Sequence, residues 1–145
     1  GNGSGYNEIR NYCSNISNVK IYGSYDYEKD ITKLYSKIDV VYSVYDTNNK
    51  NVKVALPNRL YESIVTTKPI IVSKGTKLAE FVKSKDVGFL VDAQEPDELE
   101  KLINNLLNNG NQLIDRCIAN SLSIKNEYYI DHYNGKLSSI YKKLS

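Results

Sequence analysis

The sequence predicts an α/β domain in which a mainly parallel sheet is flanked by helices. Two observations carry this prediction. Short runs rich in Val, Ile, Tyr and Phe alternate along the chain with helical patterns, and several of these runs are apolar throughout. Alternating strands and helices are the signature of βαβ units, and strands that are apolar on both faces are typical of a sheet covered on both sides. We therefore expect a Rossmann-like arrangement.

The strands are expected where these apolar runs lie: Val19–Tyr22, Asp39–Val44, Pro69–Ser73 and Gly88–Val91. Helical patterns precede, separate and follow them, at Tyr6–Cys13, Glu28–Ile38, Pro57–Thr66, Thr76–Lys83, Pro96–Asn108, Gln112–Leu122 and Tyr129–Leu144.

Local signals support individual helices. Pro57 suits a first helical turn, where its missing N–H costs nothing, and Thr76 is a good N-cap residue. The helix from Pro96 has the clearest amphipathic pattern, and Gly110 just beyond it predicts its end. Its apolar residues fall on one face: Leu99, Leu102, Ile103, Leu106 and Leu107.

Composition excludes several classes of protein. The 145 residues carry 19 basic and 17 acidic side chains, a formal net charge of +2 that predicts no nucleic-acid partner. The apolar runs are too short for a transmembrane helix. A zinc cluster is disfavoured because one histidine and two distant cysteines offer no metal-ligand spacing.

The chain opens on a glycine-rich turn, Gly1-Asn2-Gly3-Ser4-Gly5-Tyr6. Such a turn normally follows a first strand, so we expect the first strand to be truncated here. A dinucleotide-binding fingerprint would need a small residue where Tyr6 stands, which disfavours an NAD site. Glycines before a helix also let backbone N–H groups approach a phosphate, and the alternative interpretation is a flexible turn that binds no ligand.

The segment around Pro57 is the strongest candidate for a binding site. A strand ends near Val44, a polar loop follows, and the chain returns to begin a helix at Pro57. Ligands of open parallel sheets bind beyond the carboxyl ends of the strands, and unpaired N–H groups at a helix start suit a phosphate. Glu62 lies one turn after Asn58 on the same face. A simpler interpretation pairs Glu62 with Arg59 on a solvated surface, worth about 0.2–0.5 kcal/mol.

The runs Leu56-Pro57-Asn58-Arg59-Leu60-Tyr61-Glu62-Ser63 and Lys68-Pro69-Ile70-Ile71 resemble the "PNKLYE…GKPII" donor-site pattern of family 4 glycosyltransferases. Other short motifs agree with that family in order and spacing. They are Gly3, Gly23, the pair Leu34-Tyr35 and Asp39-Val40-Val41, and Gly88-Phe89-Leu90-Val91-Asp92. The resemblance covers nearly the whole chain. It implies the C-terminal half of a GT-B fold, and thus one nucleotide-sugar-binding domain over residues 1–145 with a helical tail from about residue 111.

The resemblance also implies roles for matched residues. Glu62 would hold the ribose hydroxyls of a nucleoside diphosphate sugar, while the backbone of Asn58 and Arg59 would meet the diphosphate. Gly23, Ser24 and Tyr25 would border the base, and Gly3 would let the backbone approach the sugar–phosphate cleft. No cofactor and no metal are expected, and no catalytic residue is assigned.

The resemblance implies an activity: transfer of a sugar, with retention of configuration, in cytoplasmic synthesis of surface polysaccharide or glycolipid. The resemblance also implies an N-terminal acceptor domain, which we expect to lie outside these 145 residues, so the isolated chain is expected to be inactive. The full-length enzyme could touch the inner face of a membrane.

The chain departs from the family pattern at one donor-sugar position, where Val54 replaces a glutamate. Two alternatives therefore stay open: half of a sugar-nucleotide epimerase, which shares the two-domain architecture, and a non-catalytic nucleotide-binding or interaction module.

Overall fold

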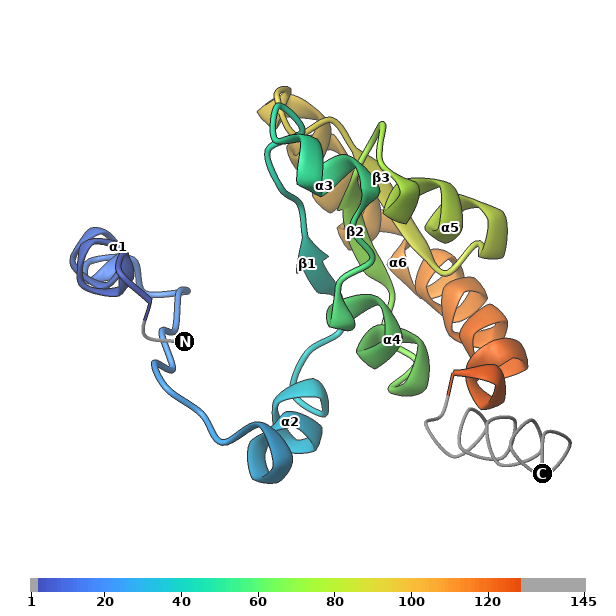
Figure 1. Cartoon of the computed structure of the whole chain (residues 1–145), viewed down its shortest axis with the longest axis horizontal. Coiled ribbons are helices and arrows are strands. Elements are labelled where there is room, and N and C mark those ends of the chain that lie inside the picture. The colour runs from blue at the N-terminus through green and yellow to red at the C-terminus, as the bar shows by residue number, and fades with distance from the viewer. Residues whose placement is uncertain (1–2, 129–145) are drawn as a thin grey trace, which may run out of the picture. The chain divides into compact units, whose positions relative to one another are not determined.

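The computed structural model describes residues 3–128 and divides the chain into two compact units, Gly1–Lys37 and Ile38–Ser145 (Figure 1). Each unit is described by itself. The helix expected over Tyr129–Leu144 lies outside the described residues.

The first unit contains two helices, α1 (Tyr6–Cys13) and α2 (Tyr27–Tyr35). The side chain of Asp26 caps α2 by accepting a hydrogen bond from the backbone N–H of Lys29. The expected strand Val19–Tyr22 does not form. Its apolar side chains are exposed, and no described segment of this unit is a strand that could pair with it, so the propensity of these residues is not enough to build one.

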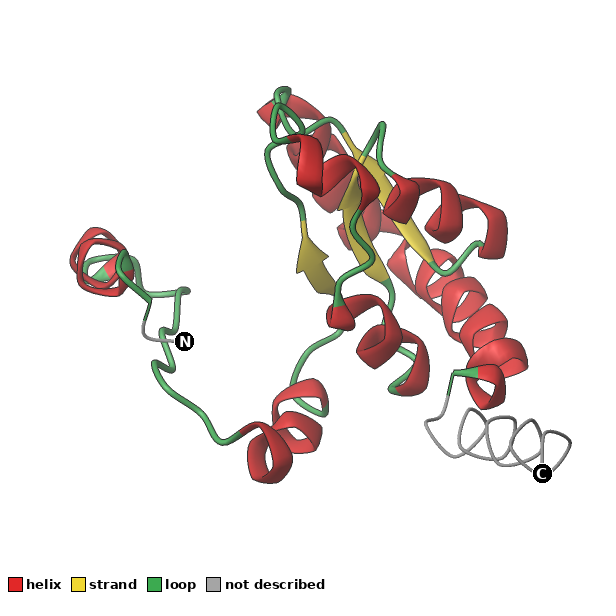
Figure 2. Cartoon of the chain, in the orientation of Figure 1, coloured by secondary structure: helices red, strands yellow, loops and turns green. Residues whose placement is uncertain are grey.

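The second unit is built on a three-stranded parallel sheet of β1 (Val41–Ser43), β2 (Ile70–Ser73) and β3 (Gly88–Val91), in the order β1-β2-β3 (Figure 2). Val41 pairs with Ile70, and Ile70 pairs with Gly88, so the strands start in step. The central strand β2 is buried along its whole length. This confirms the predicted fold class, an α/β domain with a parallel sheet flanked by helices.

The described part of this unit contains four α-helices, α3 (Lys50–Val54), α4 (Asn58–Val65), α5 (Lys77–Lys85) and α6 (Pro96–Ile124), followed by the short 3-10 helix η1 (Lys125–Glu127). α3 forms inside the segment that was expected to be a loop, with the Asn49 side chain capping its first turn. Thr76 caps α5 as predicted, because its hydroxyl accepts a hydrogen bond from the N–H of Ala79.

The sheet separates two apolar layers. Side chains of Ile71, Phe89 and Val91 pack with Cys117 and several leucines of α6 on one side. Because side chains alternate along a strand, Ile70 and Val72 face the other side, where α5 contacts both β2 and β3. The layer that contains α6 and the layer that contains α5 therefore cover opposite faces of the sheet.

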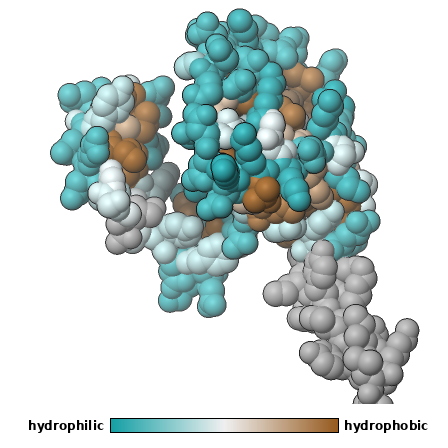
Figure 3. All heavy atoms as spheres, turned by 45° about the horizontal axis from the view of Figure 1, so that its top comes forward, coloured by the Kyte–Doolittle hydropathy of each residue, from teal (hydrophilic) through white to brown (hydrophobic). Residues whose placement is uncertain are grey.

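The prediction that a helix ends near Gly110 is wrong, since α6 runs unbroken from Pro96 to Ile124. A glycine inside a helix costs only about 1 kcal/mol relative to alanine, and packing of Leu113 and Cys117 on the sheet outweighs it. Leu107 is 78% exposed and Ile103 is also exposed, although the pattern placed both on the buried face. Figure 3 shows that hydrophobic residues lie exposed between hydrophilic ones on the molecular surface.

Asp86 ends α5 in the left-handed conformation, with φ of 50°. Its carboxylate forms an ion pair with Arg116 at 2.9 Å, and the Asn120 side chain donates to the Asp86 carbonyl at 2.9 Å. Both partners lie on α6, which therefore holds the turn that leads into β3. These contacts hold the amino ends of the strands in place. The carboxyl ends of the strands, at the opposite edge of the sheet, remain for binding a ligand.

Candidate functional site

The carboxyl ends of the parallel strands meet at one edge of the sheet, where β1 ends at Ser43 and β2 at Ser73. Ser73 is held to the chain two residues beyond Ser43, because its hydroxyl accepts from the N–H of Tyr45 at 2.7 Å and donates to the Tyr45 carbonyl at 2.8 Å. Open sheets of this kind bind ligands at this edge.

The start of α4 lies at the same edge and is open. Pro57 is its N-cap residue and makes no capping hydrogen bond through its side chain. Within the described part of the chain, the N–H groups of Asn58 and Arg59 make no hydrogen bond. No acidic residue stands in the first turn. Together with the partial positive charge of the helix end, these amides suit an anion.

The neighbouring helix starts are less suited to an anion. The first turn of α3 is capped by Asn49 and that of α5 by Thr76, so side-chain oxygens already occupy those amides. The first turn of α6 carries Asp97 and Glu98, which repel a negative ligand. α4 is therefore the most favourable place for a phosphate among these four helices.

Arg59 points toward the end of β1. Its Nη1 atom donates to the Tyr42 carbonyl at 3.4 Å and to the Tyr45 hydroxyl at 3.5 Å. Both contacts are long and exposed, so the guanidinium keeps donors for a ligand. A positive charge with donors to spare thus lies next to the open amides of α4.

Glu62 lies one turn further along α4, about 6 Å along the helix axis from Asn58, and is partly buried. Leu60 and Ile64 are fully buried. Leu60 and Ile64 therefore form the core face of α4, and Asn58 and Glu62, which the sequence places on one face, are less buried.

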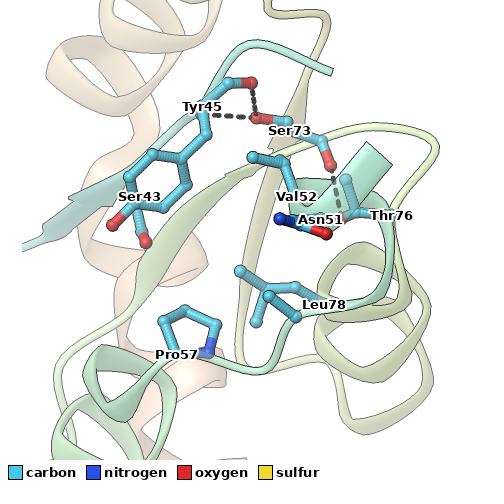
Figure 4. A pocket seen from close by; sticks show the side chains of 9 residues that line it. Ser43, Tyr45, Asn51, Val52, Pro57, Ser73, Thr76 and Leu78 are labelled. Atoms are coloured by element: carbon cyan, nitrogen blue, oxygen red, sulfur yellow. Dashed lines mark hydrogen bonds between the residues drawn. The ribbon is translucent and has the colours of Figure 1, made fainter. Parts of the chain in front are cut away.

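A cavity of 230 Å³ opens beside this helix start (Figure 4). Its wall comes from the ends of β1 and β2, from α3, and from the starts of α4 and α5. The lining residues are Ser43, Tyr45, Asn51, Val52, Ala55, Pro57, Ser73, Thr76 and Leu78.

Sequence reasoning missed Ser43, which is only 1% exposed. Its Oγ atom has no hydrogen-bond partner among the described residues. The available signal was that one predicted parallel strand ends at Ser73 and another has Ser43 one residue before its end, which places two hydroxyls near one edge. Nothing local distinguishes Ser43, whose hydroxyl is unpartnered, from Ser73, whose hydroxyl is engaged.

Polar contacts connect the loops that follow the three strands at this edge of the sheet. Lys74 Nζ lies 2.7 Å from both carboxylate oxygens of Glu98, which also accepts from the N–H of Asp92 at 2.8 Å. These hydrogen bonds, from Lys74 first, lower the pKa of Glu98 below its ordinary value. Gln94 donates to the Asp46 carboxylate at 2.9 Å. The loops after all three strands are thereby linked.

The remaining predicted residues lie in the first unit. Gly23 has φ of 70°, and a Cβ there would meet the Tyr6 hydroxyl at 3.1 Å, so the position requires glycine. Ser24 and Tyr25 are exposed just before the Asp26 cap of α2. A Cβ on Gly3 would meet nothing within 4 Å. The two groups of predicted residues thus belong to separate units.

Val54 ends α3 and is 59% exposed, so its side chain is not part of the core.

In residues 3–128 no group of His, Cys, Asp or Glu side chains has an arrangement that could hold a metal ion. In the same part of the chain, no helix has the length and apolar character needed to span a membrane.

The chain is similar to one protein family and to one curated protein. Residues 1–123 match the family described as "Glycosyl transferases group 1". The chain is also 23% identical over 119 residues to the succinoglycan biosynthesis protein ExoL of Rhizobium meliloti (strain 1021), a match that covers 79% of this chain and 30% of that protein. The chain therefore spans about a third of the length of this curated relative.

Proposed function

The chain belongs to the group 1 glycosyl transferases, and on this premise we propose that it is the donor-binding domain of a retaining glycosyltransferase. The domain would bind a nucleoside diphosphate sugar whose sugar passes to an acceptor. The observation that carries the proposal is the open start of α4, with Arg59 beside it, at the carboxyl edge of the sheet.

The diphosphate is assigned to the first turn of α4. The N–H groups of Asn58 and Arg59 would donate to its oxygens, and the guanidinium of Arg59 would add a charge-assisted hydrogen bond. These groups are in place before the sugar leaves, so they stabilise the negative charge that develops on the departing diphosphate. This is the chemical contribution that we propose for this domain.

The ribose is assigned to Glu62, one turn beyond the diphosphate. A carboxylate accepts two hydrogen bonds from neighbouring hydroxyls, and its spacing from Asn58 matches a sugar attached directly to the phosphate chain. We further propose that Gly23, Ser24 and Tyr25 border the base and that the backbone at Gly3 approaches the phosphates.

The acceptor site is assigned to a further domain, because the matched relative is about three times longer than the aligned region. The description of that relative favours a polysaccharide as the product, and we propose surface polysaccharide or glycolipid synthesis for this chain. Family membership favours a transferase over an epimerase, and we expect no sugar transfer by the 145-residue chain alone.

Calorimetric titration with UDP, GDP and their glucose conjugates tests the proposal. We expect one of the two nucleotides to bind weakly, and both Glu62→Ala and Glu62→Gln to reduce that affinity about tenfold or more, because each removes the charged acceptor of the ribose hydroxyls. Glu80→Ala, at an exposed glutamate on α5, is the matched control and should bind as the wild type does.

Circular dichroism of each variant confirms that its fold is intact. Binding that is unchanged in both Glu62 variants would refute the ribose assignment. Absence of binding by either nucleotide, even to a longer chain that restores the upstream strand, would favour the non-catalytic interaction module instead.

A further inference from the structure

The cavity at the carboxyl edge of the sheet is suited to a neutral group. None of its nine lining side chains carries a charge, and Val52, Ala55 and Leu78 give it apolar walls. Its 230 Å³ is below the roughly 300–1,000 Å³ of sites that hold drug-sized ligands. One sugar unit with a substituent is the scale of ligand that it can enclose.

Two of the cavity's serine and threonine hydroxyls, those of Ser73 and Thr76, are engaged in hydrogen bonds. The Thr76 hydroxyl donates to the Ser73 carbonyl at 2.9 Å and accepts from Ala79, and the Ser73 hydroxyl is held by the backbone of Tyr45. Ser43 differs, because its hydroxyl is buried and meets no partner in the described chain. A buried hydroxyl without a partner is unfavourable, so Ser43 indicates a ligand atom that would complete it.

The cavity adjoins the proposed phosphate site directly. Pro57, the N-cap residue of α4, lines the cavity. Tyr45 lines it as well, and its hydroxyl accepts from Arg59. In Figure 4, Val52, Pro57 and Leu78 face one hollow from separate elements, with Ser43 and Tyr45 on its other side. A group attached to a phosphate on α4 is therefore within reach of Ser43.

We propose that this cavity receives the acetamido group of an N-acetylated donor sugar, and that the Ser43 hydroxyl donates to its carbonyl oxygen. The acetamido methyl would pack on Val52, Ala55 and Leu78. This inference rests on the proposed donor-binding function and specifies its substrate class.

Other sugars fit the cavity less well. A plain hexose brings hydroxyls that lose water against the apolar walls without gaining enough partners. A deoxy sugar supplies a methyl group for the walls but leaves Ser43 without a partner. An acetamido group satisfies both features, because it carries one methyl and one strong acceptor.

Saturation-transfer difference NMR on the 145-residue chain tests the inference without knowledge of the base. The ligands are the α-1-phosphates of N-acetylglucosamine and N-acetylgalactosamine, each compared with its parent hexose 1-phosphate. We expect the N-acetylated member of one pair to bind about tenfold more tightly, with the strongest saturation on its acetyl methyl protons.

Two variants locate the effect. Ser43→Ala should remove most of the N-acetyl preference without abolishing binding of the hexose 1-phosphate. Ala55→Phe, which narrows the cavity from an exposed position, should remove the preference as well. Ser123→Ala, at an exposed hydroxyl on α6 outside the cavity, should keep it.

UDP and GDP, titrated in the same experiment, separate the two proposals. If a nucleotide binds in a Glu62-dependent manner but the N-acetyl preference is absent, or survives in both cavity variants, the acetamido subsite is refuted and the donor-binding function stands. A preference for 6-deoxyglucose 1-phosphate would also refute the subsite. If neither nucleotide nor any sugar phosphate binds, both proposals fail.

Discussion

Gly88→Ala tests the packing of the sheet that supports the site. A Cβ on Gly88 would lie well inside van der Waals contact with the carbonyl oxygen of Ile70, and only 2.9 Å from the Ile70 carbonyl carbon and nitrogen. These atoms belong to the backbone of the central strand, so they cannot rotate away as a side-chain end would. The strands β2 and β3 must therefore separate.

The expected cost follows from this geometry. Overpacking costs about 1–3 kcal/mol, and each weakened hydrogen bond of the β2–β3 ladder adds about 1 kcal/mol. We expect Gly88→Ala to lower the free energy of unfolding by about 3 kcal/mol or more. For a chain of this size that corresponds to a fall in Tm of roughly 10 °C.

The same substitution at Gly110 provides a control of opposite sign. Gly110 lies inside α6, and a Cβ there would meet the nearest atom, Ile114 Cδ1, at an ordinary 3.7 Å. Gly110→Ala should therefore raise the free energy of unfolding by about 0.5–1 kcal/mol. Urea denaturation followed by circular dichroism measures both. A Gly88→Ala chain as stable as the wild type or as Gly110→Ala would refute the reasoning.

Three further predictions concern single side chains. Ser43→Ala should raise the free energy of unfolding in urea by about 1 kcal/mol, because it removes a buried hydroxyl without a partner; a loss of stability would contradict this. Burial raises the pKa of Cys117 to about 11, so iodoacetamide at pH 8 should alkylate the partly exposed Cys13 first. Mass spectrometry of tryptic peptides measures the order of alkylation, and earlier alkylation of Cys117 would contradict the prediction. The pKa of Glu98 is lowered chiefly by its hydrogen bond from Lys74, so its contribution to stability is present at neutral pH and is lost as the pH falls through the lowered pKa. Thermal unfolding from pH 7 to pH 3 should show a smaller loss of stability in Glu98→Gln than in the wild type.

Elements supported by several signals were predictable from the sequence. Pro69–Ser73 and Gly88–Val91 are apolar runs between turn residues, and they form β2 and β3 within one residue of the predicted bounds. Gly110 was misleading because its signal is local, whereas packing on the sheet decides whether α6 continues. Val19–Tyr22 shows the converse, since strand propensity without a partner strand in its own unit leaves the segment irregular.

The site was predictable only in part. Pro57 and the spacing from Asn58 to Glu62 indicate a helix start with a carboxylate one turn along, and α4 has that form. The helix α3, the cavity and the isolated hydroxyl of Ser43 depend on how distant segments pack. Residue types alone do not encode which of two strand-ending serines finds a hydrogen-bond partner.

Backbone-amide NMR during titration with UDP and GDP tests the central claim most directly, because it reports where the phosphates bind. We predict saturable shifts that are largest at the amides of Asn58 and Arg59, with smaller changes at Glu62. Shifts that concentrate at the starts of α5 or α6, or that are absent from α4 while nucleotide binds, would contradict the assignment of the diphosphate to this helix.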